Sequence, residues 1–108
     1  MVGGEMIRHC VFVKFQPAVP QAERDSIYAA LRGLQVKIDG LESAAFGANV
    51  NAERLAWGFD EGFILDFRDA KAQDAYTRHP EHPPIIERLL AAVDGGLDGV
   101  FCFDMKIE

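Results

Sequence analysis

The sequence predicts an α+β domain of the ferredoxin-like type, a four-stranded antiparallel sheet with helices packed on one face. Two observations predict it. Segments of alternating apolar residues, rich in β-branched and aromatic side chains, lie at 6–15, 41–48, 59–67 and 100–107. Apolar residues at helical spacing separate the first segment from the second and the third from the fourth. The order is therefore β-α-β-β-α-β, and 108 residues suffice for one core.

The first strand, 6–15, has two faces, because successive side chains point to opposite sides. His9 belongs to the odd face and Cys10 to the even face. Pro20 suits the first turn of the following helix. An apolar stripe then runs from Ile27 to Leu34 at helical spacing.

The middle of the chain is the least regular part. Strand 41–48 is weaker than the others, and 47–58 contains asparagine and glycine residues that favour a loop. Leu55 and Trp57 lie in this loop, and we expect both to be buried. The clearest strand, 59–67, follows.

The last third predicts two helical segments and a strand. Asp69 is a good N-cap for a helix reaching about Arg78, and Pro80 ends it. A second apolar stripe at 85–93 predicts another helix before glycines at the turn. The final strand is 100–107.

Bulk composition excludes several classes of protein. The net charge of −6 and the scattered basic residues argue against a nucleic-acid surface. No apolar stretch has the length of about 18 residues that a membrane span needs. Residues 1–5 are expected to be a flexible leader to a domain at 6–108. The two cysteines are too few for a disulfide scaffold, which favours a cytoplasmic protein with free thiols.

The stretch 75–84 holds the main candidate functional residues, Tyr76, His79 and His82. Histidine titrates near neutral pH, so a tyrosine and a histidine form a plausible acid and base without a metal or cofactor. His9 of the first strand is expected to border the same pocket between sheet and helices. A neutral His82 would take a proton from carbon next to a carbonyl while Tyr76 stabilises the enolate.

Each of these residues also has a purely structural interpretation. Tyr76 fits a core position with a satisfied hydroxyl. His79 fits a helix C-cap, and His9 a hydrogen-bonded core histidine. A metal site at His79 and His82 is disfavoured by the intervening proline and the lack of a third ligand.

Several short motifs occur in one order along the chain. They are Ile7-Arg8-His9, Val13-Lys14-Phe15, Gly47-Ala48-Asn49-Val50, Gly58-Phe59 leading to Asp66-Phe67, and Ala75-Tyr76 followed by His79-Pro80-Glu81-His82. In these motifs the chain resembles the stress-responsive A/B barrel family of dimeric α+β barrel proteins, which includes the plant olivetolic acid cyclase. The resemblance spans nearly the whole domain.

The resemblance implies a homodimer in which two sheets pack face to face into a barrel. It also implies a cofactor-free cyclase or aldol site with Tyr76 and His82 as the catalytic pair, and with His9 and His79 in the ligand pocket. The chain departs from the family pattern in three places: Glu61 replaces a third-strand histidine, Met105 replaces a tyrosine after Asp104, and Pro83-Pro84 follows His82.

The strand pattern supports a dimer through the sheet. The odd positions of the strands are the more apolar and are expected to face the helices. The even positions still carry apolar residues, which a second copy would cover. These residues are Met6, Cys10, Phe12, Ile64, Val100 and Cys102. By the same parity Cys10 and Cys102 are expected to lie close together as free thiols. The alternative is a monomer with scattered exposed apolar residues.

Three functions fit these features. The first is a small-molecule enzyme that binds a carbonyl or phenolic ligand and moves protons through Tyr76 and His82. The second is a non-catalytic, stress-associated oligomer with a binding or structural role. The third is a cofactor-free oxygenase.

Overall fold

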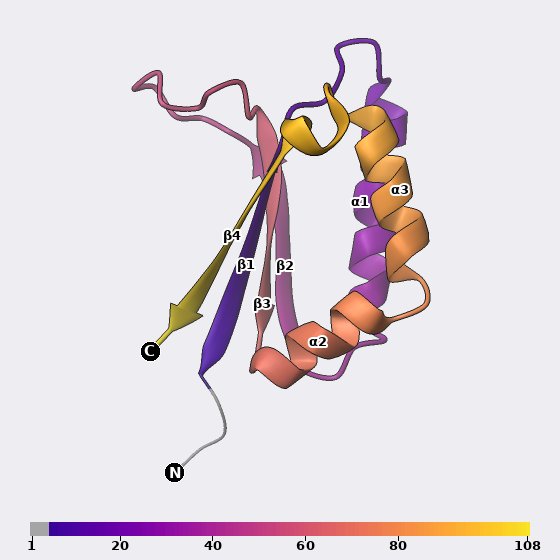
Figure 1. Cartoon of the computed structure of the whole chain (residues 1–108), viewed down its shortest axis with the longest axis vertical. Helices are drawn as coiled ribbons and strands as arrows, with labels where there is room; N and C mark the ends of the chain where they lie inside the picture. Colours follow the sequence, from indigo (N-terminus) through magenta and orange to yellow (C-terminus); the bar gives the residue numbers. More distant parts are fainter. Residues whose placement is uncertain (1–4) are drawn as a thin grey trace.

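The computed structural model describes residues 5–108, and its elements follow the predicted order (Figure 1). They are β1 (Met6–Val13), α1 (Gln21–Gln35), β2 (Leu41–Ala48), β3 (Glu61–Phe67), α2 (Ala70–Arg78), α3 (His82–Ala92), η1 (Gly96–Gly99) and β4 (Val100–Ile107). Residues 1–4 of the expected leader lie outside the described range. In that range no helix is both long and apolar enough to cross a membrane.

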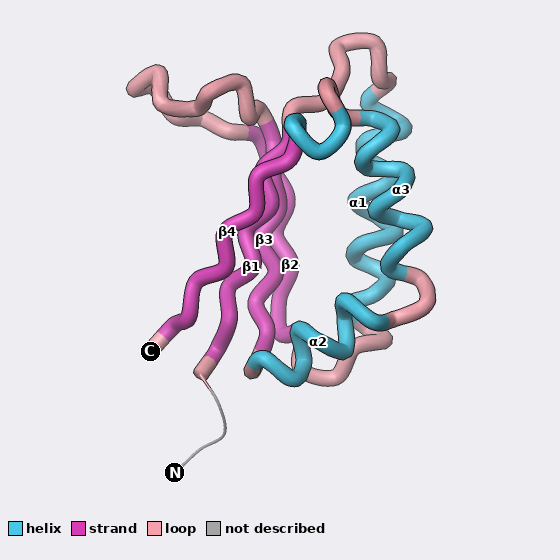
Figure 2. Tube along the Cα trace, in the orientation of Figure 1, coloured by secondary structure: helices cyan, strands magenta, loops and turns pink. Residues whose placement is uncertain are grey.

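The sheet has the order β2-β3-β1-β4, and every neighbouring pair of strands is antiparallel. All three α-helices lie on one side of this sheet (Figures 1 and 2). We call that side the helix face and the opposite side the open face. The predicted ferredoxin-like fold is therefore confirmed.

The core fills the space between the helix face and the helices. Its fully buried side chains come from both layers, which is what alternating strands and amphipathic helices require. They include Val13, Phe63, Leu65 and Phe67 from the sheet, and Ile27, Leu31, Leu34, Tyr76 and Leu89 from the helices. These side chains fix where the helices stand on the sheet.

The two helices after β3 are set by local sequence signals. The Asp69 side chain accepts a hydrogen bond of 2.8 Å from the Ala72 backbone N–H, so the predicted N-cap is confirmed. α2 ends at Arg78 with His79 as its C-cap. Three residues separate α2 from α3, and the first turn of α3 contains prolines, which need no backbone N–H partner there.

Two strand ends differ from the prediction. β1 ends at Val13, and Phe15 forms only an isolated bridge to Val93. β3 begins at Glu61, two residues later than predicted, so Phe59 belongs to the preceding loop. In this single chain Leu55 and Trp57 are 60% and 77% exposed, so the expectation that they are buried is wrong.

The parity predicted for the last strand is also wrong. Cys10 pairs with Phe103 across β1 and β4, and Val11 pairs with Cys102. Directly opposed residues share a face of the sheet, so Phe103 lies on the open face and Cys102 on the helix side. The two thiols are free and lie on opposite faces. Even positions of β1 share a face with odd positions of β4, because the pairing register of the two strands, and not the residue number, decides which side chains lie on the same face.

Candidate functional site

Three of the four predicted site residues come together on the helix face. His9 is on β1, Tyr76 on α2 and His82 at the start of α3. The rings of Tyr76 and His82 meet edge to face, with their centroids 4.6 Å apart. The His9 ring lies 6.3 Å from that of Tyr76. The turn between α2 and α3 thus brings Tyr76 and His82 together beside His9 of β1.

A carboxylate of β4 holds His9 in place. His9 Nδ1 lies 2.5 Å from Asp104 Oδ1, and Gln73 Nε2 donates to Asp104 Oδ2 at 2.9 Å. A carboxylate only accepts hydrogen bonds, so Nδ1 carries a proton, and Nε2 is the ring nitrogen not used in this bond. Burial works to raise the pKa of Asp104, but the bonds from His9 and Gln73 outweigh it and lower that pKa. Asp104 therefore stays ionised and fixes the orientation of the imidazole.

Tyr76 is held as a neutral hydrogen-bond donor. Its side chain is 2% exposed, and burial, with a smaller contribution from Cys102, raises the pKa of the Tyr76 hydroxyl well above its usual value. Desolvation disfavours the phenolate, so the proton stays on oxygen throughout the neutral range.

The pKa of His82 is lowered, whereas that of Tyr76 is raised. Burial lowers the pKa of His82, and the neighbouring His9 lowers it further, while a backbone hydrogen bond at Thr77 works against both. The imidazole is therefore neutral at pH 7 and free to accept a proton. A donor and an acceptor whose pKa values are pushed apart by their surroundings form a recognisable acid–base arrangement.

The structure does not bring His79 into this cluster. Its Nδ1 accepts a hydrogen bond of 3.1 Å from the Glu81 backbone N–H, within the turn that joins the helices. His79 is thus the C-cap residue of α2, and its ring organises the next turn. A ligand contact through His79 stays a prediction. Among residues 5–108, no group of three or more histidine, cysteine or carboxylate side chains is placed to hold a metal ion.

The cluster opens toward solvent along β4. The Asp104 side chain is 48% exposed and that of His9 17%. Two cavities, of about 670 Å³ and 390 Å³, are found elsewhere, and neither is lined by His9, Tyr76 or His82. Tyr76 is buried at the centre of the cluster, and the pocket expected at these three residues stays a prediction.

A second polar cluster occupies the other end of the helix face. Tyr28 of α1 donates to Glu61 Oε1 at 3.0 Å, and Arg24 Nη1 donates to Glu61 Oε2 at 2.7 Å. Burial, followed by the bond to Glu61, raises the pKa of Tyr28. The smaller cavity lies beside this cluster, between α1 and β2. Both carboxylate oxygens of Glu61 thus accept hydrogen bonds from side chains of α1.

The sequence reasoning gave no role to Gln73, Asp104 or Tyr28. Gln73 lies one turn before Tyr76 on α2, so helical spacing from a candidate residue would have found it. Asp104 lies 95 positions from His9, and only the β1–β4 register brings them together. Tyr28 directly follows Ile27 of the apolar stripe, where a buried hydroxyl has no local signal.

Comparisons with known proteins agree with this fold. The family model described as Stress responsive A/B Barrel Domain (Dabb) matches residues 7–107. No curated protein sequence matches the chain. A dimeric ferredoxin-like protein of unknown function from Jannaschia sp. CCS1 is 28% identical, with a TM-score of 0.88 over 94% of this chain and 99% of that one.

Two solved structures with named activities share the fold at lower identity. The hydroxynitrile lyase from Passiflora edulis is 18% identical, with a TM-score of 0.83 over 98% of this chain and 96% of its own. SnoaB, a cofactor-independent oxygenase from Streptomyces nogalater, is 11% identical, with a TM-score of 0.75 over 97% and 95%. At these identities the likeness concerns the fold alone. The family match over nearly the whole chain is the decisive finding: this protein belongs to the stress-responsive A/B barrel domain family.

Proposed function

We propose that the chain binds a small carbonyl or phenolic compound beside β4 and moves a proton through His82 and Tyr76. The observation that carries this proposal is the contact of a neutral imidazole with a neutral phenol, 4.6 Å between ring centroids, on the helix face beside β1. The cytoplasmic location expected from the free thiols stays a prediction.

The chemistry follows from the protonation states. The ring nitrogen of His82 removes a proton from carbon next to the carbonyl, and the electron pair moves onto the carbonyl oxygen. The Tyr76 hydroxyl donates a hydrogen bond to that oxygen and stabilises the enolate. Return of the proton to carbon completes an exchange. Attack of the carbanion on a second carbonyl carbon instead moves that carbonyl's π electrons onto its oxygen, and the alkoxide takes the proton held by His82 to give an aldol product. Such acid–base catalysis contributes about 10² to 10⁴ in rate.

His9 and Asp104 support this step by electrostatics and position. The ionised Asp104 holds the His9 ring through Nδ1, so Nε2 is the ring nitrogen that would bond a ligand hydroxyl or phenol. Gln73 holds the other carboxylate oxygen. A phenolic ligand would thus be oriented by His9 while its carbonyl group lies against Tyr76.

The test is deuterium exchange at the methyl group of acetophenone in D2O, followed by NMR. The wild-type protein is expected to accelerate exchange over buffer, and His82→Ala is expected to abolish the acceleration. Tyr76→Phe should slow exchange while keeping the imidazole. Arg78→Ala is the control, because the exposed Arg78 side chain lies on the same helix and pairs with Asp74, and this variant should exchange like wild type.

The alternatives give different results in the same experiment. Acceleration that is indifferent to His82→Ala would contradict the proposed role of His82. Chemical-shift changes at the His9 and His82 rings on adding acetophenone, without exchange, would favour a non-catalytic binding protein. Oxygen consumption with a phenolic compound would favour the cofactor-free oxygenase.

We also propose that two copies associate through the open face. Phe101, Phe103 and Met105 of β4 are 49%, 48% and 45% exposed there, although large apolar side chains gain free energy on burial. The Jannaschia relative is described as dimeric. Sedimentation at micromolar concentration should give the mass of two chains. A mass of one chain would contradict the proposed dimer.

A further inference from the structure

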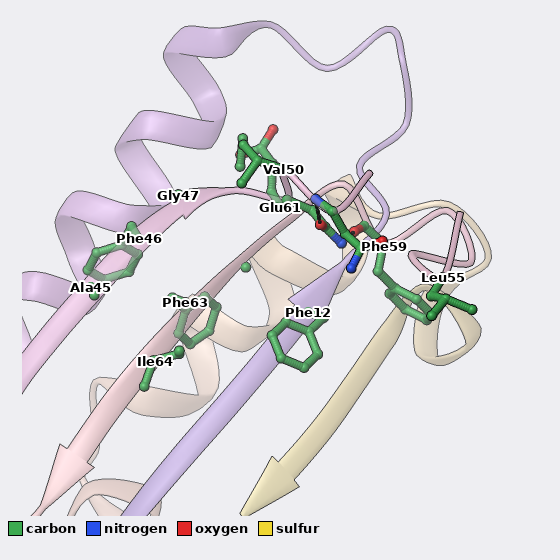
Figure 3. A pocket seen from close by; sticks show the side chains of 14 residues that line it. Phe12, Ala45, Phe46, Gly47, Val50, Leu55, Phe59, Glu61, Phe63 and Ile64 are labelled. Carbon is green, nitrogen blue, oxygen red and sulfur yellow. Dashed lines mark hydrogen bonds between the residues drawn. The ribbon is translucent and has the colours of Figure 1, made fainter. Parts of the chain in front are cut away.

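The two cavities of the molecule differ in the charge of their walls. The larger, of about 670 Å³, is lined almost entirely by uncharged residues, most of them from β2, β3 and the loop 49–60 (Figure 3). The smaller, of about 390 Å³, lies between α1 and the end of β2, and its lining includes Asp25, Arg32 and Glu61. Its volume suits a small organic molecule. Charged side chains of both signs give the smaller cavity a means of orienting such a molecule.

One wall of the smaller cavity is a single side of α1. Its lining residues recur at helical spacing, so their side chains project from the same side of the helix. They are Gln21, Asp25, Tyr28 and Arg32. The buried stripe of the same helix packs on the sheet and fixes α1 in place. The polar groups therefore stand on a rigid element, which positions a site more precisely than a loop does.

Arg32 supplies a guanidinium that faces an aromatic ring. Its Cζ lies 4.3 Å from the centroid of the Phe46 ring. Among residues 5–108 it forms no ion pair, whereas Arg24 of the same helix pairs with Glu61. A guanidinium over a ring keeps the N–H donors of its own plane, and these fit a carboxylate through two parallel bonds. Arg32 thus favours a ligand that carries a carboxylate.

The back of the cavity is aromatic. The centroids of the Tyr28 and Phe46 rings lie 5.0 Å apart, with the planes inclined by 40°. Phe63 packs against both rings, at 6.2 Å from Tyr28 and 5.5 Å from Phe46. The core therefore holds these rings in place, and their remaining surface gains free energy from contact with another planar ring. This wall favours an aromatic body for the ligand.

The other polar atoms of the cavity are acceptors. Asp25 Oδ1 accepts a bond of 2.9 Å from Gln21, whereas Oδ2 has no partner in the described part of the chain. Both oxygens of Glu61 already accept bonds from α1. A carboxylate accepts hydrogen bonds and donates none, so Asp25 requires a donor on the ligand. Asp25 and Arg32 are about 10 Å apart along the helix, so they address opposite ends of one molecule.

We propose that the cavity between α1 and β2 is a second binding site, for an aromatic carboxylic acid with a hydrogen-bond donor across the ring. The carboxylate pairs with Arg32, the ring packs against Tyr28 and Phe46, and the donor bonds Asp25 Oδ2. The chain has a net charge of −6, so a general attraction for anions does not produce such binding. The site includes no residue of the proposed proton transfer and stands independently of it.

Calorimetric titration with 4-hydroxybenzoate tests this assignment, and NMR locates the bound molecule. Saturable binding is expected at millimolar concentration or below, with shifts of the Tyr28, Gly47 and Ala48 amide signals. Arg32→Gln removes the charge and should raise the dissociation constant about tenfold or more. Arg78→Gln is the matched control, because it makes the same change of charge at the exposed end of α2, and it should bind like wild type. Circular dichroism checks that both variants are folded.

Asp25→Ala tests the far end of the ligand. The wild-type protein should bind 4-hydroxybenzoate about tenfold more tightly than benzoate, which lacks the donor. In Asp25→Ala the two dissociation constants should become nearly equal. Comparing the two ligands within one variant cancels the general effect of removing a negative charge. A preference that survives in Asp25→Ala would overturn the contact with Asp25.

The remaining outcomes separate this site from the proton-transfer site. Signal shifts confined to the His9 and His82 rings would overturn the site on α1 and leave the proposed function standing. Three further results would also overturn it: no saturation in the millimolar range, wild-type affinity in Arg32→Gln, or tighter binding of 4-hydroxybenzylamine, which carries a cation in place of the carboxylate. Arg32→Gln should exchange acetophenone like wild type, and a loss of exchange would contradict the separation of the two sites.

Discussion

At the scale of single residues, the polar side chains of the helix face act in bonded groups. Asp104 holds His9, and Glu61 holds both Tyr28 and Arg24. The Arg24 and Glu61 side chains are only 19% and 16% exposed, so their mutual bond is poorly screened by water. Removing one member of such a group leaves the others partly buried and unpaired.

Glu61 provides the sharpest stability prediction at this scale. Glu61→Ala should lower the free energy of unfolding by about 2 to 3 kcal/mol, because the Arg24 charge and the Tyr28 hydroxyl lose their acceptor. Glu61→Gln should cost less, since its amide oxygen still accepts from Tyr28. Urea denaturation measures both variants.

Glu53→Ala is the matched control for this change. Glu53 is exposed in the loop 49–60, where truncation is expected to change stability by less than about 0.5 kcal/mol. An equal effect of the two alanine substitutions would contradict the bridging role of Glu61.

At the scale of elements, the start of α2 decides where Tyr76 stands. The Asp69 cap fixes the first turn, and Tyr76 follows nearly two turns later on the buried side. α2 has only nine residues, so an isolated helix of this length would be marginal in water. The cap therefore contributes directly to holding the site.

Asp69→Ala is expected to cost about 1 kcal/mol of unfolding free energy, because the Ala72 N–H loses its acceptor. Asp74→Ala removes an aspartate from the same helix and serves as the comparison. Asp74 makes only an exposed pair with Arg78, which contributes about 0.3 to 0.5 kcal/mol. Chemical denaturation of both variants tests the difference, and a larger loss for Asp74→Ala would contradict the capping argument.

Two glycines on neighbouring strands, Gly62 of β3 and Gly47 of β2, should differ in how an added methyl group changes stability. Gly62→Ala should destabilise the fold by about 1 to 3 kcal/mol, because its Cβ would meet the Val11 carbonyl oxygen, which is backbone and cannot move aside. Gly47→Ala should be neutral or slightly stabilising, since its Cβ enters open space. Thermal unfolding at equal protein concentration compares them. Equal melting temperatures would show that β3 relaxes around the added carbon.

At the scale of the whole molecule, stability should depend on pH in two steps. The pKa of His82 in the folded chain lies below its ordinary 6.5, so between these values the unfolded chain binds more protons. Stability is then full above pH 6.5 and falls as pH drops through that window. The pKa of Asp66 is lowered chiefly by its hydrogen bond from Arg8, and that of Asp104 by His9 and Gln73. Their stabilisation is present above 3.8 and is lost at lower pH.

Unfolding free energies measured in urea from pH 8 to pH 3 should therefore show a decline that begins below 6.5 and steepens below 3.8. His82→Gln should flatten the first part, and Asp66→Asn should reduce the second. A wild-type curve that stays level between pH 7 and pH 5 would contradict the buried, neutral state assigned to His82.

The element order and most of the site elements could be predicted from the chain itself. Alternation in 6–15, the helical stripe from Ile27 to Leu34 and the Asp69 cap are local signals; the stripe and the cap appear in the structure as predicted, and the strand appears but ends at Val13. The stretch from Tyr76 to His82 was recognisable because prolines mark the turn and two ionisable rings flank it. Family membership, too, followed from short motifs in a fixed order.

Only the tertiary structure decided the partners of those residues. The pairing of His9 with Asp104 and the placement of Phe101 and Phe103 on the open face both depend on strand register. A shift of one residue would exchange the two faces of a strand without changing its local pattern. Periodicity encodes which elements form, whereas register comes from packing among residues far apart in sequence, so the partners of the site residues became visible only in the folded chain.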